Sequence, residues 1–233
     1  MLWMKGWYET RIRLLVVAGA TVLICAIASS DSTSANAGVS AQGLDATTLI
    51  GASVLAAAML AGAGIKTQAG GFRPSKGLHG SMYYTLTLPV SRVHLLSVRA
   101  SIGLIETALI HTLVCGAALL ARPALRLTIP PADLLKHNIG AFFCVGAVYF
   151  LGVFFATFLD DYYQMMASVF SLLLLIVILN RMPLPASFNR LLLLSQASPL
   201  ITHTMPWVGI TALVALSATL FLFSMWIVKR REY

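Results

Sequence analysis

The segment YYTLTLPVSRVHLLSVRASIGLIE, residues 83–106, joins a polar stretch broken by Pro89 to the start of a long apolar run. Pro89 ends any helix that precedes it, because proline lacks a backbone N–H and restricts the residue before it. Ser91 can then cap a new helix, which continues past Arg99 and Glu106. The segment therefore predicts a short helix, a proline hinge and then a helix of membrane-spanning length.

The rest of the chain has the composition of a membrane protein. Of its 233 residues, 58% are hydrophobic and only 10% are charged, whereas soluble domains carry about 25% charged residues. The mean hydropathy is +0.85, and apolar runs of about 20 residues, the length that crosses a bilayer, recur along the chain. Because lipid offers no partner for exposed backbone groups, these runs predict helices. We expect an all-α, polytopic integral membrane protein.

Six runs predict six transmembrane helices in a single domain that covers residues 1–233. With a cytoplasmic N-terminus, eleven of the sixteen Lys and Arg residues lie on one side and five on the other. This asymmetry places both termini and the 66–98 loop in the cytoplasm, and the chain in the cell membrane as a multi-pass protein. The 30–46 loop, which contains Asp31 and Asp45 but no Lys or Arg, favours the same orientation. The expected spans are about 14–29, 47–65, 99–121, 138–158, 163–180 and 207–228.

The first apolar run and the aromatic residues before it can each be interpreted in two ways. A basic start followed by LLVVAGATVLICAIA, residues 14–28, also fits a secretory signal peptide, although five further spans favour a retained helix. Trp3, Trp7 and Tyr8 stand among Lys5, Arg11 and Arg13. This mixture fits either a short helix in the headgroup layer or an aromatic belt.

Several function classes lack their motifs in this chain. The formal net charge is +8, but the basic residues flank apolar runs and form no stripe, which disfavours nucleic-acid binding. Cys25, Cys115 and Cys144 are isolated and predict no metal site. The sequence GAGIKT, residues 62–67, lacks the glycine that a phosphate loop requires directly before lysine, so we expect no ATP site in this chain.

An intramembrane hydrolase or lipid-modifying enzyme is an alternative. Ser53 and His111 are the nearest candidates for a nucleophile and its base, but nothing in the sequence brings them together. Glu106, His111 and Asp160 are the other candidates. Glu106 and His111 are five residues apart, which separates them by about 140° around a helix.

Small residues in the second and fourth runs predict close helix packing, either within the subunit or between two copies. Ala57 and Ala61, and likewise Ala58 and Gly62, are four residues apart, a spacing that lets helix backbones approach. We interpret the glycines of the fourth run in the same way. These glycines are Gly140, Gly146 and Gly152.

The core LPVSR, residues 88–92, with Arg99 and Glu106 after it, resembles the segment between the second and third spans of permease subunits of type-2 ATP-binding-cassette (ABC) exporters. In that family a short coupling helix precedes this core. The resemblance covers the segment itself and, more loosely, the span number and loop plan. It implies an export permease that pairs with a second permease, of the same or a different kind, across the second and fifth spans.

The same resemblance implies the partners and the site. Two cytoplasmic ATPase subunits would bind ATP and Mg²⁺, so this chain would hold no cofactor and would not itself be an enzyme. Membrane lipid would surround it. Glu106, together with Arg99, would be a buried polar structural residue. The residues expected to couple the permease to the ATPase are Tyr83, Tyr84, Leu86, Pro89, Ser91 and Arg92. A membrane subunit that only anchors a partner complex is a further alternative, and the sequence does not name a substrate.

Overall fold

The computed structural model describes residues 2–31, 44–61, 91–121, 130–159, 161–181 and 204–230. Within these residues all regular structure is helical, and one helix falls in each predicted run. The helices are α1 (Leu2–Asp31), α2 (Leu44–Leu60), α4 (Arg92–Ala121), α6 (Pro131–Ala156), α7 (Asp161–Arg181) and α10 (Trp207–Arg230).

Three of these helices are long and apolar enough to cross a membrane. They are α4 over Val93–Ala117, α6 over Pro131–Ala156, and α10 over Trp207–Arg230. Parts of α2 and α7, Gly51–Leu60 and Tyr163–Leu174, are shorter apolar helices. The all-helical architecture and these three helices agree with an integral membrane protein.

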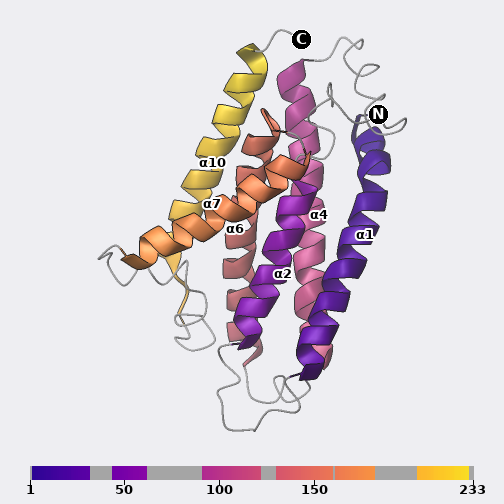
Figure 1. Ribbon diagram of the computed structural model, residues 1–233. Helices are drawn as coiled ribbons and strands as arrows, with labels where there is room; N and C mark the ends of the chain where they lie inside the picture. The colour runs from indigo at the N-terminus through magenta and orange to yellow at the C-terminus, as the bar shows by residue number, and fades with distance from the viewer. Residues whose placement is uncertain are drawn as a thin grey trace.

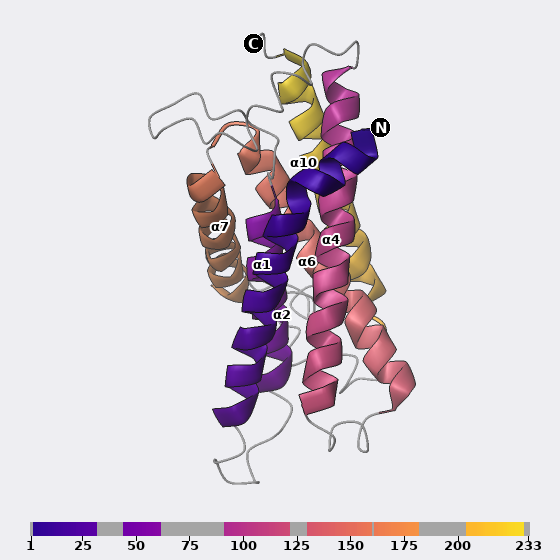
Figure 2. The same cartoon turned by 90° about the vertical axis from the view of Figure 1, so that its right-hand side faces the viewer.

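The helices form an elongated bundle (Figure 1). Helices α1, α2, α4 and α6 run in alternating directions, and α1 begins at the same end of the bundle at which α10 ends. Helix α4 extends beyond the start of α1 at that end. Helix α7 crosses obliquely in front of α6 and α10 in this view. Figure 2 shows that α1 bends near its N-terminus, so that its first turns lie across α4.

Two helix starts differ from the sequence prediction. Helix α1 is continuous from Leu2, so the aromatic N-terminal residues belong to the same helix as the first apolar run. Helix α6 begins at Pro131, seven residues before the predicted start at 138. Proline is favoured at a first helical position, and Asp133 in the first turn suits the helix dipole. An ion pair between Lys136 and Asp133, with 2.8 Å between nitrogen and oxygen, adds to this turn.

The buried core has two parts. One lies where α2, α4 and α10 pack on α6, and its centre includes Val145, Tyr149 and Val153. The other lies between α1, α2 and α4, around Leu60, Ile110 and Val114. Helix α4 therefore contributes to both parts, and it contacts α1, α2, α6 and α10.

Small residues let α2, α6 and α7 approach one another closely, as their spacing predicts. Ala57 and Ala58 on α2, and Ala61 directly after it, are all buried inside this single chain. A Cβ atom added to Gly152 of α6 would overlap the Cβ of Ala61 and lie 2.9 Å from Nε2 of Gln164 on α7.

The other two glycines of α6 do not share this role. A Cβ on Gly146 would make only ordinary contact, 3.9 Å from a Leu104 methyl, and one on Gly140 would meet nothing within 4 Å. Within this chain Gly140 and Gly146 therefore do not bring two helices into close contact, and packing of either glycine against a second copy stays a prediction.

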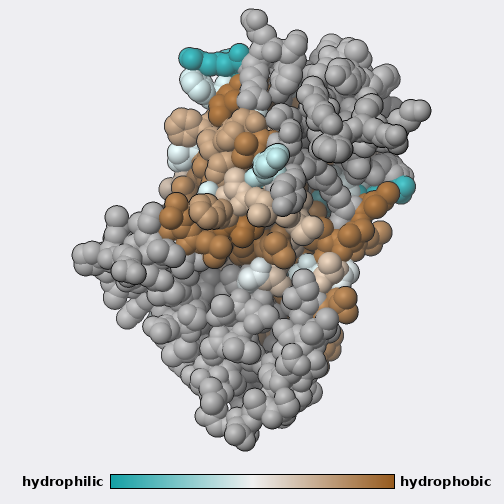
Figure 3. All heavy atoms as spheres, viewed as in Figure 1, coloured by the Kyte–Doolittle hydropathy of each residue, from teal (hydrophilic) through white to brown (hydrophobic). Residues whose placement is uncertain are grey.

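The outer surface of the described helices is apolar. Figure 3 shows brown, hydrophobic side chains over the face formed by α7 and α10, with hydrophilic side chains at the end of α10. Phe170 and Leu174 of α7, and Leu222 and Phe223 of α10, are among the exposed apolar residues. Arg230 at the end of α10 lies over the Trp226 ring, 4.1 Å from its centroid. An apolar belt that ends at a cation–aromatic pair is typical of a surface in contact with lipid.

Candidate functional site: the start of α4 and the buried polar contacts below it

Helix α4 begins where the sequence predicts a cap. The Ser91 hydroxyl accepts a hydrogen bond from the backbone N–H of His94 at 3.2 Å, which is the geometry of an N-cap. Arg92 is the first helical residue, and the helix runs without interruption for 30 residues. The prediction that this helix leads directly into an apolar span is confirmed. The coupling candidates Tyr83, Tyr84, Leu86 and Pro89 lie outside the described residues.

Glu106 is fully buried in the interior, about four turns into α4. Its side chain is 0% exposed, and its Oε1 accepts a hydrogen bond from the Thr10 hydroxyl of α1. No partner is found for Oε2 within the described part of the chain. Arg99, two turns earlier on α4, is half-buried. The Thr10 contact ties the bent start of α1 to α4 at the one carboxyl group that the sequence singles out inside this helix.

We expect Thr10→Val to lower the free energy of unfolding by about 1–2 kcal/mol, because it leaves a buried carboxyl without its hydroxyl partner. In a Glu106→Leu background the same substitution should have little effect, so the double-mutant cycle should be non-additive. Reversible unfolding in mixed micelles measures the free energy of unfolding of the parent protein, the two single variants and the double variant. Thr21→Val is the matched control, because Thr21 is also buried but bonds within α1, to the Val17 carbonyl at 2.5 Å. If the effects of Thr10→Val and Glu106→Leu on the free energy of unfolding were additive, the contact between these two side chains would be contradicted.

Ser53 and His111, which nothing in the sequence brings together, meet in the structure. His111 Nδ1 of α4 lies 3.0 Å from the Ser53 hydroxyl of α2. His111 Nε2 lies 3.3 Å from the backbone carbonyl oxygen of Asn138 in α6. A carbonyl oxygen can only accept a hydrogen bond, so the ring nitrogen that faces it, Nε2, is assigned the proton. Nδ1 then carries no proton and accepts a hydrogen bond from the Ser53 hydroxyl. This chain of hydrogen bonds joins three helices.

Other polar residues surround His111. The Cys115 sulfur lies 3.8 Å from His111 Nε2, and His137 on α6 is buried beside the bonded Asn138. Among the described residues, no three His, Cys, Asp or Glu side chains gather as they would around a metal ion. Glu106 points to α1 whereas His111 points to α2 and α6, so the structure does not bring these two candidates together. Asp160 lies outside the described residues.

Tyr149 of α6 fixes the approach of α6 to the first half of α4. Its hydroxyl donates to the Ala100 carbonyl at 3.0 Å, and its side chain is 2% exposed. A Cβ atom on Gly103 would overlap the Tyr149 ring, so α4 can pack here only with glycine at that position. Because the large Tyr149 side chain is buried and its hydroxyl is hydrogen-bonded, it sets the register of α6 against α4.

Gln164 of α7 satisfies the end of α2. Its side-chain N–H donates to the Ala58 carbonyl at 3.0 Å. The last four carbonyls of a helix have no partner inside that helix, and α2 ends at Leu60. Gln164 therefore caps α2 from a neighbouring helix, shortly before the loop, about residues 66–98, that the sequence assigns to coupling.

The comparisons with known proteins were negative. The chain matches no protein-family model, no curated protein and no solved structure. The assignment of function therefore rests on the residues themselves and on this geometry.

Sequence reasoning found Ser91 and Glu106 but missed Thr10 and Gln164. The signal for Thr10 is its spacing, because Thr10, Val17 and Thr21 are all buried and fall on one side of α1. A threonine within that apolar stripe marks a position that needs a polar partner. Gln164 carries a similar signal, as an uncharged polar residue one turn into an apolar helix.

Proposed function

We propose that this chain is the permease subunit of an ATP-driven exporter and that a separate ATPase works on it through the residues 83–92. The observation that carries the proposal is helix α4. It starts at a Ser91 cap two residues after Pro89 and continues unbroken past Glu106. A rigid helix of this length, about 45 Å, transmits a displacement of its first turn to all four helices that it contacts.

The arrangement of the helices supports the proposed topology. We propose that all six helices cross the membrane and that both termini are cytoplasmic. Helix α2 ends and α4 begins at the end of the bundle where α1 begins and α10 ends (Figure 1). The coupling segment between α2 and α4 would then lie in the cytoplasm, within reach of an ATPase. The permease would pair with a second copy or a related chain, and the ATP and Mg²⁺ would be held by two ATPase subunits.

In such a transporter the hydrogen bonds between helices would hold the helices in register. Membrane helices have no hydrophobic driving force to hold them in register, so interhelical hydrogen bonds and close packing of small residues do so. The Thr10–Glu106 bond, the Tyr149–Ala100 bond and the Gln164–Ala58 bond each join a different pair of helices near the same end of the bundle. We propose that they make the bundle respond as a unit when the start of α4 moves.

Co-purification tests the proposal. The chain is expressed with candidate ABC-type ATPases of its source organism, and each complex is isolated by an affinity tag on the ATPase. We expect a stable complex whose ATPase activity exceeds that of the ATPase alone. Co-purification without any change in ATP hydrolysis would instead indicate a subunit that only anchors its partner. Failure to co-purify would contradict the proposal.

One observation favours a second candidate, an intramembrane hydrolase. The Ser53–His111 pair has the hydrogen-bond geometry of a nucleophile with its base, and the Asn138 carbonyl orients the ring from the other side. The side chains of Ser53 and His111 are, however, only 1% and 2% exposed, which leaves a substrate no access to the hydroxyl. A fluorophosphonate probe decides between the two. The permease proposal predicts no labelling, whereas labelling at Ser53 that is lost in His111→Ala would establish the hydrolase.

A further inference from the structure

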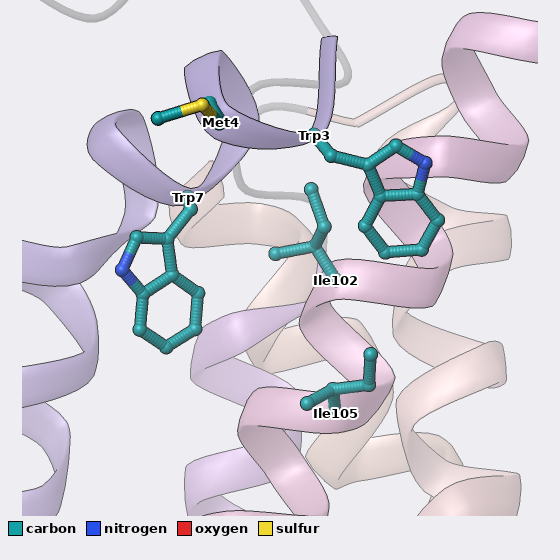
Figure 4. Close-up of a pocket in the computed structure, with 5 residues that line it drawn as sticks. All are labelled: Trp3, Met4, Trp7, Ile102 and Ile105. Carbon is teal, nitrogen blue, oxygen red and sulfur yellow. The ribbon is translucent and has the colours of Figure 1, made fainter. Parts of the chain in front are cut away.

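An apolar pocket lies between the first turns of α1 and helix α4. Trp3, Met4 and Trp7 of α1 line one side, and Ile102 and Ile105 of α4 line the other. Its volume is about 320 Å³, at the lower end of the range for ligand sites. Figure 4 shows the two indole rings on either side of Ile102 and Ile105.

The pocket is formed by the packing of α1 against α4 and is not a chance irregularity of the surface. Ile102 is 3% exposed and forms its inner wall, whereas Trp3 and Ile105 are each 50% exposed at its rim. Thr10 lies about one turn after Trp7, and Glu106 lies about one turn after Ile102. Their hydrogen bond fixes α1 against α4. The bend of α1 seen in Figure 2 brings its tryptophans over α4. The opening therefore has a fixed wall on both sides.

The shape and lining fit a single hydrocarbon chain. All five lining residues are apolar or aromatic, so the indole N–H groups of Trp3 and Trp7 are the only polar groups that these side chains can offer a ligand. The pocket also spans only about one turn of each helix, whereas a docked partner helix needs a longer groove that receives residues at i, i+4 and i+7. Tryptophans at the start of a membrane helix are typical of the boundary between headgroups and acyl chains.

The sequence at the start of α1 is predominantly basic, which fits an anionic headgroup. Residues 2–13 carry Lys5, Arg11 and Arg13 against a single acid, Glu9. Arg11 is exposed. Basic residues next to an opening between membrane helices attract acidic lipid headgroups.

We propose that this pocket binds one acyl chain of an anionic phospholipid, whose headgroup lies against the basic start of α1. The lipid would act as a wedge between α1 and α4 beside the Thr10–Glu106 bond. The proposal needs only that the chain lies in a membrane, and it stands or falls independently of the permease function.

Quenching by brominated lipids tests the site. A Trp207→Phe/Trp226→Phe protein, reconstituted in liposomes, retains Trp3 and Trp7 as its only indoles. Phosphatidylglycerol and phosphatidylcholine, each with brominated acyl chains, are titrated into a phosphatidylcholine background. We expect brominated phosphatidylglycerol to reach half-maximal quenching at a mole fraction roughly fivefold lower, the preference that one engaged basic residue provides.

Two variants with matched controls separate the pocket from the surrounding lipid. Ile105→Phe should fill the pocket and remove the preference, whereas Leu109→Phe, one turn further along α4 and similarly exposed, should retain it. Lys5→Gln/Arg11→Gln should also remove the preference, and Lys229→Gln/Arg230→Gln at the end of α10 should not.

Three outcomes would overturn the proposal. The first is equal quenching by the two lipids in the parent protein. The second is a preference for phosphatidylglycerol that survives Ile105→Phe. The third is a native mass spectrum in which a non-lipid molecule, such as a transported substrate, is retained by the parent protein and lost in Ile105→Phe.

Discussion

Replacing Gly152 with leucine is expected to lower the unfolding temperature in detergent by about 4–12 °C. The position lies where α2, α6 and α7 meet, and even a Cβ atom there would overlap Ala61 and crowd Gln164. Overpacking of a close-packed interior costs about 1–3 kcal/mol, and each kcal/mol shifts the midpoint of a chain of this length by about 2–4 °C. The branched side chain belongs at the upper end of the first range, because its neighbours are a Cβ atom and the Gln164 amide that caps α2.

The matched control is a pair of glycine-to-alanine substitutions on the same helix. Gly152→Ala should destabilise the protein. Gly140→Ala should leave the stability unchanged or raise it by about 0.4–1 kcal/mol, because alanine restricts the unfolded chain and its Cβ meets nothing within 4 Å. A thermal shift assay with a thiol-independent dye measures both. Equal changes in unfolding temperature for Gly152→Ala and Gly140→Ala would show that α2 and α6 do not approach each other closely at Gly152.

Leu86→Arg and Arg92→Glu are expected to reduce ATP hydrolysis by the co-purified complex to the level of the isolated ATPase. Leu86 belongs to the apolar side of the short helix that the sequence predicts before Pro89, and a charge there would disrupt docking on a partner. Arg92 is the first residue of α4, so a reversed charge at this position changes the contact at the end of the rigid helix.

The control for these variants is Arg190→Glu, which makes the same charge change as Arg92→Glu in a loop expected on the opposite side of the membrane. It should leave the stimulated ATP hydrolysis unchanged. Activity is assayed in proteoliposomes with and without the permease, and assembly is checked by size-exclusion chromatography. If Leu86→Arg and Arg92→Glu both left assembly and stimulated turnover intact, the assignment of residues 83–92 to coupling would be wrong.

The helices and their approximate positions were accessible from the sequence. Spanning-length apolar runs leave the backbone no alternative to a helix in lipid, and each run contains a helix. The start of α4 was also accessible, because a proline followed two residues later by serine is a local signal for a helix boundary. The start of α6 at Pro131 was missed, because its first two turns contain Asp133, Lys136 and His137, and an apolar-run criterion begins only where the hydropathy rises.

The polar contacts between helices could not be predicted. Thr10 and Glu106 are 96 residues apart, and Ser53 and His111 are 58 apart. Helical periodicity shows which residues share a face, but it does not show which helix that face meets. The separation of Glu106 and His111 around α4 was predicted from their spacing. That Glu106 would face α1, and His111 α2 and α6, depends on how the helices pack.

The location of Tyr83 decides the central claim, which is that the segment before α4 faces a cytoplasmic ATPase. A Tyr83→Cys protein, in a background with Cys25, Cys115 and Cys144 replaced by alanine, is treated with a membrane-impermeant maleimide. A Ser34→Cys protein, with its cysteine in the loop expected outside the cell, serves as the control. We predict that the cysteine at position 83 reacts only after the cells are permeabilised, whereas the one at position 34 reacts in intact cells. Labelling of position 83 in intact cells would place the segment beyond the reach of any cytoplasmic ATPase and contradict the account.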